Sequence, residues 1–74
     1  MQKFTANVIV PDDLDLESFG SMMEHAGFTV SLSPEAHALV AQRTAPHLDV
    51  FLEDLEEELS PFPTATIDDF GVAG

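Results

Sequence analysis

Only two of the 74 residues are basic, Lys3 and Arg43, whereas fourteen are acidic, so the formal net charge is -12. Charges of one sign repel one another and destabilise a compact chain. The chain must therefore gain its stability from apolar burial. Its composition allows this, because 45% of the residues are hydrophobic, a share that disordered acidic tails do not reach. The sequence thus predicts a folded core in spite of the self-repulsion.

The chain is short and contains no cysteine. A length of 74 residues is near the lower limit for a domain that folds alone, so we expect one compact domain over 1–70 and a loose tail over 71–74. Without cysteine there are no disulfides, which small secreted domains usually need, and this favours a cytoplasmic protein. No basic segment precedes a long apolar run, and no apolar stretch reaches about 18 residues, which argues against a signal peptide and a membrane span.

The first part of the chain has the patterns of a strand, a helix and a second strand. Residues 4–10 begin with alternating apolar and polar side chains, which predicts a strand. Its inward side chains would be Phe4, Ala6, Val8 and Val10. A helix is predicted over 15–26, because Asp15 suits the N-cap and Gly27 suits the left-handed position that closes a helix. Residues 28–32 alternate again and predict the second strand.

The second part of the chain is less clear. Residues 37–43 fit a helix or a strand, and the preceding Ser33-Pro34-Glu35 suits a helix start as well as a hairpin turn. Another helix is expected to open at Thr44-Ala45-Pro46 and to end at the prolines of 60–63. Its apolar stripe would consist of Leu48, Phe51, Leu52, Leu55 and Leu59. A short edge strand over 64–67 follows.

The chain also resembles itself when it is shifted along its own sequence. Leu14, Asp15, Glu24 and Phe28 recur 34 residues later as Leu48, Asp49, Glu58 and Phe62. Two strand-helix-strand halves would give an α+β domain of order β-α-β-β-α-β, the ferredoxin-like plan. That plan requires a strand at 37–43. The alternative is a β-α-β-α-α fold with a helix at 34–44.

The acidic residues are clustered. Six of them follow Pro46, namely Asp49, Glu53, Asp54, Glu56, Glu57 and Glu58. On a helix they form like-charge pairs at i,i+3 and i,i+4, which cost roughly 0.2–0.5 kcal/mol each, and no Lys or Arg of the segment offsets them. The last three also lie near the helix C-terminus, where the helix dipole favours cations. Local rules broken at such a cost often mark a functional surface.

The density of this cluster suits phosphate mimicry. Ten helical residues span roughly 14 Å, so the six acids supply about one charge per 2.3 Å, and duplex DNA carries about one per 1.7 Å. Such a row suits a groove whose Arg and Lys side chains bind phosphates. The simpler interpretations are a solvated face that keeps the protein soluble, and adaptation to high salt. A second group, Asp12, Asp13 and Asp15, is explained first by helix-start chemistry and would extend the acidic surface.

No pattern for catalysis or for a bound metal stands out. The sequence contains no Gly-x-Ser-x-Gly, no phosphate-binding loop and no Gly-x-Gly-x-x-Gly. His25, His37 and His47 have no spacing typical of metal ligands. A chain of this size also rarely builds a substrate pocket. We therefore expect no enzyme, no cofactor and no metal.

In size, acidity and lack of a catalytic motif, the chain is similar to the nucleic-acid-mimic inhibitors that phages encode, such as anti-CRISPR and anti-restriction proteins. The resemblance implies an inhibitor that binds a basic nucleic-acid-binding protein in the host cytoplasm, and it carries over no functional residue. Direct contact with nucleic acid or membrane is not expected, because both are anionic. The alternative is a small structural or regulatory module whose acidity serves only solubility or salt tolerance. Such a module could dimerise through the open sheet face, lined by Thr5, Asn7, Ile9, Thr29 and Ser31.

Overall fold

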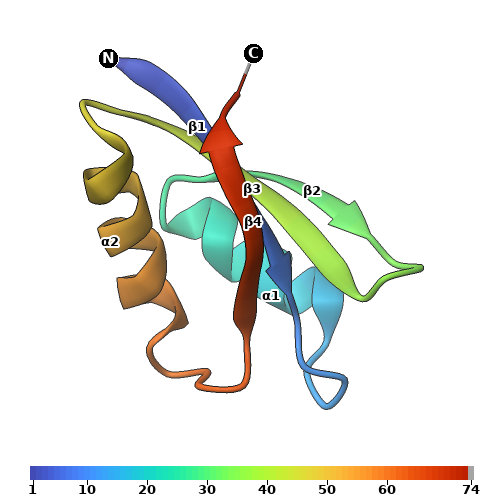
Figure 1. Ribbon diagram of the computed structural model, residues 1–74. Coiled ribbons are helices and arrows are strands. Elements are labelled where there is room, and N and C mark those ends of the chain that lie inside the picture. Colours follow the sequence, from blue (N-terminus) through green and yellow to red (C-terminus); the bar gives the residue numbers. More distant parts are fainter. Residues whose placement is uncertain (74) are drawn as a thin grey trace.

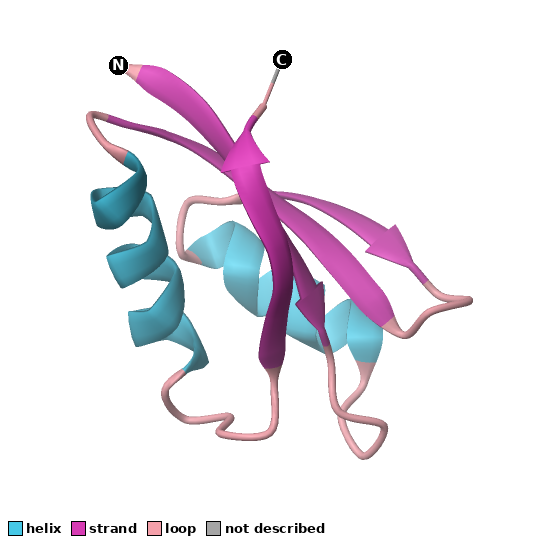
Figure 2. Ribbon diagram, in the orientation of Figure 1, coloured by secondary structure: helices cyan, strands magenta, loops and turns pink. Residues whose placement is uncertain are grey.

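In the computed structural model, which describes residues 1–73, strands and helices alternate in the order β-α-β-β-α-β (Figure 1). The elements are β1 (Gln2–Ile9), α1 (Leu16–His25), β2 (Thr29–Ser33), β3 (Ala38–Ala45), α2 (Leu48–Leu59) and β4 (Thr66–Val72). The strands form one antiparallel sheet in the order β2-β3-β1-β4. Both helices pack on the same side of it (Figure 2). This arrangement confirms the predicted ferredoxin-like fold.

The alternation in β1 decides which face of the sheet is buried. Phe4, Ala6 and Val8 are at most 4% exposed, and Val10 just after the strand is buried as well, as predicted. The register with β3 places Ala41 opposite Ala6 on the same face. The side chains between these positions face the side of the sheet that no helix covers.

The helix α1 begins and ends where its sequence signals place it. The Asp15 carboxylate accepts hydrogen bonds from the Ser18 backbone N–H at 3.0 Å and from the Ser18 hydroxyl at 2.8 Å. At the other end Gly27 has a φ of 101°, which side-chain-bearing residues rarely adopt. The Phe28 N–H then donates to the Met23 carbonyl at 3.1 Å. This bond closes the helix by the Schellman arrangement.

Residues 38–45 form the strand β3, so the strand interpretation is confirmed and no helix forms over 34–44. A four-residue turn, Pro34–His37, joins β2 to β3. It is closed by a hydrogen bond from the Ala36 N–H to the Ser33 carbonyl at 3.2 Å. The strand lies between β1 and β2, where it buries Leu39 and Ala41 in the core.

The helix α2 begins later than expected. Residues 44–45 belong to β3, where they pair with the first residues of β1, and the helix starts at Leu48 with His47 at the N-cap. The expected opening at 44–46 is therefore wrong, because sheet pairing holds these residues extended. The end is confirmed, since α2 stops at Leu59, ahead of the two prolines. The starts of the two helices consequently differ by 32 residues and their ends by 34.

The predicted apolar stripe of α2 forms the centre of the core. Phe51 and Leu55 are fully buried, and the ring centroid of Phe51 lies 5.8 Å from that of Phe4 and 6.1 Å from that of Phe28. Leu59 is buried too, whereas Leu48 and Leu52 are partly buried against the core. The helix is thus attached to the sheet by aromatic packing.

The last strand, β4, lies later and is longer than the strand expected at 64–67. It pairs with β1 through a register shift that leaves Asp68 without a partner, a bulge. The sheet continues through Gly71 and Val72, and the Ala73 N–H donates to the Lys3 carbonyl at 2.9 Å. These three residues were expected in a loose tail. The rest of that expected tail, Gly74, lies outside the described residues.

Candidate protein-binding surface

The acidic residues avoid most of the sheet. The strands β1, β2 and β3 contain no Asp or Glu, whereas α2 contains six of the fourteen and α1 contains two. The remaining acids lie in the segment before α1, in the β2–β3 turn and in β4, and they are Asp12, Asp13, Asp15, Glu35, Asp68 and Asp69. The negative charge is therefore concentrated on the helix layer and its connections.

Four of the six acids of α2 are exposed to solvent, Asp49, Glu53, Glu56 and Glu57. At 100° per residue they occupy an arc of about 100°, on the opposite side from the buried Phe51 and Leu55. Their spacings of three and four residues make them neighbours on the helix surface. The face points away from the core, so these carboxylates form a continuous outer row. We refer to these four residues as the α2 row.

The other two predicted acids of α2, Asp54 and Glu58, are half-buried and lie outside the row. Asp54 forms an ion pair with Arg43 of β3, in which Oδ2 and Nη1 lie 3.6 Å apart and both side chains are 38% exposed. The Arg43 guanidinium also lies 5.4 Å from the ring centroid of Phe28. Within residues 1–73 this is the one ion pair between side chains. The sequence correctly shows no cation inside the segment, but it does not show that β3 brings one to Asp54.

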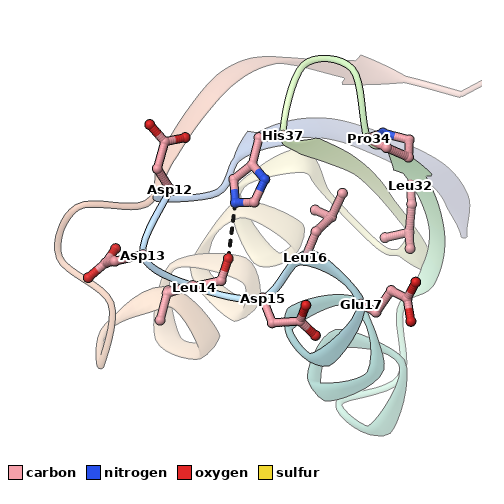
Figure 3. Close-up of a pocket in the computed structure, with 9 residues that line it drawn as sticks. All are labelled: Asp12, Asp13, Leu14, Asp15, Leu16, Glu17, Leu32, Pro34 and His37. Atoms are coloured by element: carbon pink, nitrogen blue, oxygen red, sulfur yellow. Dashed lines mark hydrogen bonds between the residues drawn. The ribbon is translucent and has the colours of Figure 1, made fainter.

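Of the three acids before α1, Asp15 has a structural role and the other two are only exposed. Asp15 caps the helix, and the hydrogen bonds from the Ser18 hydroxyl and N–H lower the pKa of its carboxyl from the ordinary value. This confirms helix-start chemistry for Asp15. Asp12 and Asp13 are exposed and line an open hollow of about 500 Å³ beside the helix start (Figure 3).

His37 links the two chain segments that border this hollow. Its Nε2 lies 2.9 Å from the Pro11 carbonyl oxygen and 3.0 Å from the Leu14 carbonyl oxygen, so it donates to both. Figure 3 draws the bond to Leu14. Its own backbone has a φ of 49°, and its carbonyl accepts a hydrogen bond from the Val10 N–H at 3.0 Å. The β2–β3 turn is thereby fixed to the segment before α1. The sequence carries no local signal for this contact, because 23 or more residues separate the partners.

The C-terminal end of α2 lies close to the start of α1. The ring of Phe62, which follows α2, meets that of Phe19 edge to face with centroids 5.1 Å apart. Leu14 and Asp15 line the same small hollow as these two rings. The two predicted acidic groups thus belong to neighbouring parts of the helix layer, although α1, β2 and β3 separate them in the sequence.

Two other kinds of site, a metal centre and a membrane-spanning helix, are absent from residues 1–73. Among residues 1–73, no three His, Asp or Glu side chains are placed to hold a metal ion. In the same part of the chain, no helix combines the length and the apolar character that a membrane crossing needs. Comparison of the chain with protein-family models, with curated proteins and with solved structures found no match.

Proposed function

We propose that the protein is an inhibitor or adaptor that binds a basic, nucleic-acid-handling protein through the α2 row, in competition with nucleic acid. The observation that carries the proposal is the exposure of Asp49, Glu53, Glu56 and Glu57 on one helix face, with no ion pair to any of them within residues 1–73. Unpaired carboxylates of this kind pair readily with Arg and Lys of another molecule.

The spacing of the row supports a phosphate-binding partner. From Asp49 to Glu57 the helix rises roughly 12 Å, so the four exposed carboxylates supply about one charge per 3–4 Å. A single DNA strand carries about one phosphate per 3.4 Å. A groove that binds one strand by its phosphates therefore offers cations at a similar interval. Arg is the preferred partner in such a groove, because its fork accommodates a carboxylate as well as a phosphate.

The open face of the sheet supports a protein rather than a nucleic acid as the partner. Sheets that bind single strands use aromatic side chains for stacking, within a positively charged surface. The side chains that β1, β2 and β3 place on this face include one cation, Lys3, and no aromatic ring. A single ring, Phe70 of β4, borders the hollow that Thr5 and Asn7 line. The net charge of -12 adds a general repulsion of phosphates.

The proposal places the interaction in the cytoplasm of a host cell, as for the phage inhibitors that the chain is similar to. The absence of cysteine agrees with a reducing compartment. The competing function is an acidic structural or regulatory module, and the two functions differ in what the α2 row does. In the proposed inhibitor the row makes contacts, whereas in such a module it only repels other molecules.

The test is capture from a host lysate at about 50 mM salt, followed by a competition assay with the purified captured protein. We expect a nucleic-acid-binding protein whose nucleic acid displaces this chain, with an affinity that falls steeply between 0.1 and 1 M salt. The variant Glu53→Gln/Glu57→Gln should weaken this binding. The variant Glu35→Gln/Asp68→Asn removes the same charge elsewhere and should not. Equal losses in the two variants, or binding that salt leaves unchanged, would contradict the proposal.

A further inference from the structure

The two free edges of the sheet are built differently, and β4 is the protected one. The Ala73–Lys3 hydrogen bond sets the alternation of β4, which turns the Phe70 N–H away from β1 toward the free edge. The Asp69 carboxylate accepts that N–H at 2.9 Å. The bulge at Asp68 further interrupts the edge. Charges and bulges are the devices by which proteins prevent strands from adding at an edge.

The β2 edge has none of these devices. Its sequence, Thr-Val-Ser-Leu-Ser, contains no charge and no proline, and its five residues pair with β3 in an uninterrupted register. No side-chain hydrogen bond within residues 1–73 involves Thr29–Ser33. Leu32 is 40% exposed. The edge therefore offers free backbone groups beside a partly exposed apolar side chain.

Two carboxylates of α1 lie beside this edge. The helix approaches β2 so closely at Gly20 that a Cβ there would lie 2.8 Å from Leu32 Cδ2 and 3.4 Å from Val30 Cγ1. Glu17 and Glu24 are exposed and lie three residues before and four residues after Gly20, on the same stripe of the helix. Glu17 and Leu32 border the same hollow (Figure 3).

We propose that β2 is a docking edge for an extended, basic segment of a partner protein, which adds to the sheet as a fifth strand. Main-chain hydrogen bonds to Thr29–Ser33 would provide the pairing, as in other cases of strand addition. On the helix side the segment would place an apolar side chain near Leu32 and a cation near each of Glu17 and Glu24. The inference rests on the proposed function only for the positive charge of the partner.

Charge complementarity is the reason for choosing a basic segment rather than a second copy of this chain. Two copies paired through their β2 edges would bring two α1 helices together, each with Glu17 and Glu24 on the approaching side. Like charges that meet at an interface disfavour association. A cationic segment meets the same carboxylates with attraction.

The probe is the acetylated and amidated peptide Thr-Lys-Thr-Val-Thr-Lys-Thr. Its two lysines lie about 14 Å apart in an extended strand, whereas Glu17 and Glu24 lie about 10 Å apart along the helix axis, a difference that long side chains bridge. Titration of the labelled full chain, followed by NMR, should shift the backbone amides of Thr29–Ser33. A peptide with proline in place of valine keeps the charge and should lose these shifts, because it cannot pair as a strand.

Two charge variants locate the attraction. Glu17→Gln/Glu24→Gln should weaken peptide binding about fivefold at low salt. Glu53→Gln/Glu57→Gln removes the same charge from the α2 row and should change the affinity less than twofold. Shifts confined to α2, equal losses in the two variants, or equal binding of the proline peptide would each overturn the proposal. So would a dimer in sedimentation that the peptide dissociates, because a second copy would then be the occupant.

This experiment can fail without the proposed function failing. It uses neither the captured partner nor its nucleic acid, and its decisive variant leaves the α2 row intact. A captured protein that depends on Glu53 and Glu57 while the peptide leaves β2 unshifted would support the inhibitor and remove the docking edge. If the peptide shifts β2 but no captured protein depends on Glu53 and Glu57, the docking edge is supported and the inhibitor is not.

Discussion

The two helices occupy equivalent places in the fold but are stabilised in different ways. The helix α1 has an acid at its N-cap and a glycine closure at its C-terminus, so its free backbone groups are satisfied locally. The helix α2 has His47 at the N-cap, without a side-chain hydrogen bond, and no basic residue in its last turn. Its outer face carries the α2 row. One helix follows the local rules and the other breaks several of them.

The difference shows what holds α2 in place. Phe51 and Leu55 are fully buried, and Phe51 packs against the ring of Phe4 in β1 and that of Phe28, which directly precedes β2. Tertiary burial, rather than capping or charge pairing, therefore stabilises this helix. A helix held from its inner side is free to carry an unfavourable charge pattern on its outer side. The following predictions test this contrast, beginning with the largest effect.

Truncation of the inner side of α2 should unfold the protein. Phe51→Ala removes the ring that contacts Phe4 and Phe28, at a cost of about 3–5 kcal/mol, and a small domain has only about 5 kcal/mol of stability. Far-UV circular dichroism and urea unfolding measure the loss. Phe70→Ala is the control, because that ring is 49% exposed and its loss should cost less than about 1 kcal/mol. A Phe51→Ala protein as stable as the control would show that burial does not hold α2.

These packing contacts explain how much of the fold the sequence could predict. The alternation in β1, the caps of α1 and the stripe of α2 are local patterns, and the structure confirms all three. The start of α2 and the extent of β4 differ from the prediction, because pairing with β1 decides both. Sequence patterns indicate how a segment can fold by itself, whereas a strand partner can extend or override that preference.

The anchor of the segment before α1 should show the next largest effect. His37→Ala leaves the Pro11 and Leu14 carbonyls without their donor, at a cost of about 1–3 kcal/mol in the free energy of unfolding. His37→Asn keeps a residue that tolerates the φ of 49° but is too short to reach both carbonyls. Urea unfolding of both variants separates the two causes. If His37→Asn is as stable as the wild type, His37 stabilises the fold through its left-handed backbone and not through the two hydrogen bonds.

The N-cap of α1 makes a prediction about pH. The pKa of Asp15 is lowered in the folded state by the Ser18 hydrogen bonds, so its cap stabilises the fold at pH values above the unfolded pKa of about 3.9. This contribution should be lost as the pH falls through the folded pKa. The Tm of the wild type should exceed that of Asp15→Asn at pH 6, because asparagine keeps a cap but not its charge, and the difference should shrink toward pH 2. A difference that stays constant with pH would rule out the charged cap.

The candidate surface was only partly predictable, for a related reason. Helical periodicity alone separates Asp49, Glu53, Glu56 and Glu57 from the core side of α2. The pairing of Asp54 with Arg43 depends on β3, and no local pattern reports it. The unprotected β2 edge could not be found either, because the strand order decides which strands lie at an edge. Properties of a single helix face are therefore readable from sequence, whereas edges and ion pairs require the assembled sheet.

The smallest effect tests whether the α2 row is costly at all. Glu57→Lys removes the like-charge contact with Glu53, replaces it by an attractive pair and places a cation near the C-terminus of the helix dipole, so it should stabilise the protein by about 1 kcal/mol. Asp49→Lys also removes a repulsive pair with Glu53, but its cation lies in the first turn, where the dipole opposes it, so its net effect should be near zero. The gain at position 57 should shrink in 1 M salt, which screens exposed charges. Thermal unfolding at two salt concentrations measures both variants. If Glu57→Lys gives no gain in stability at low salt, the α2 row does not destabilise the fold. The charge pattern would then need no binding function to explain it.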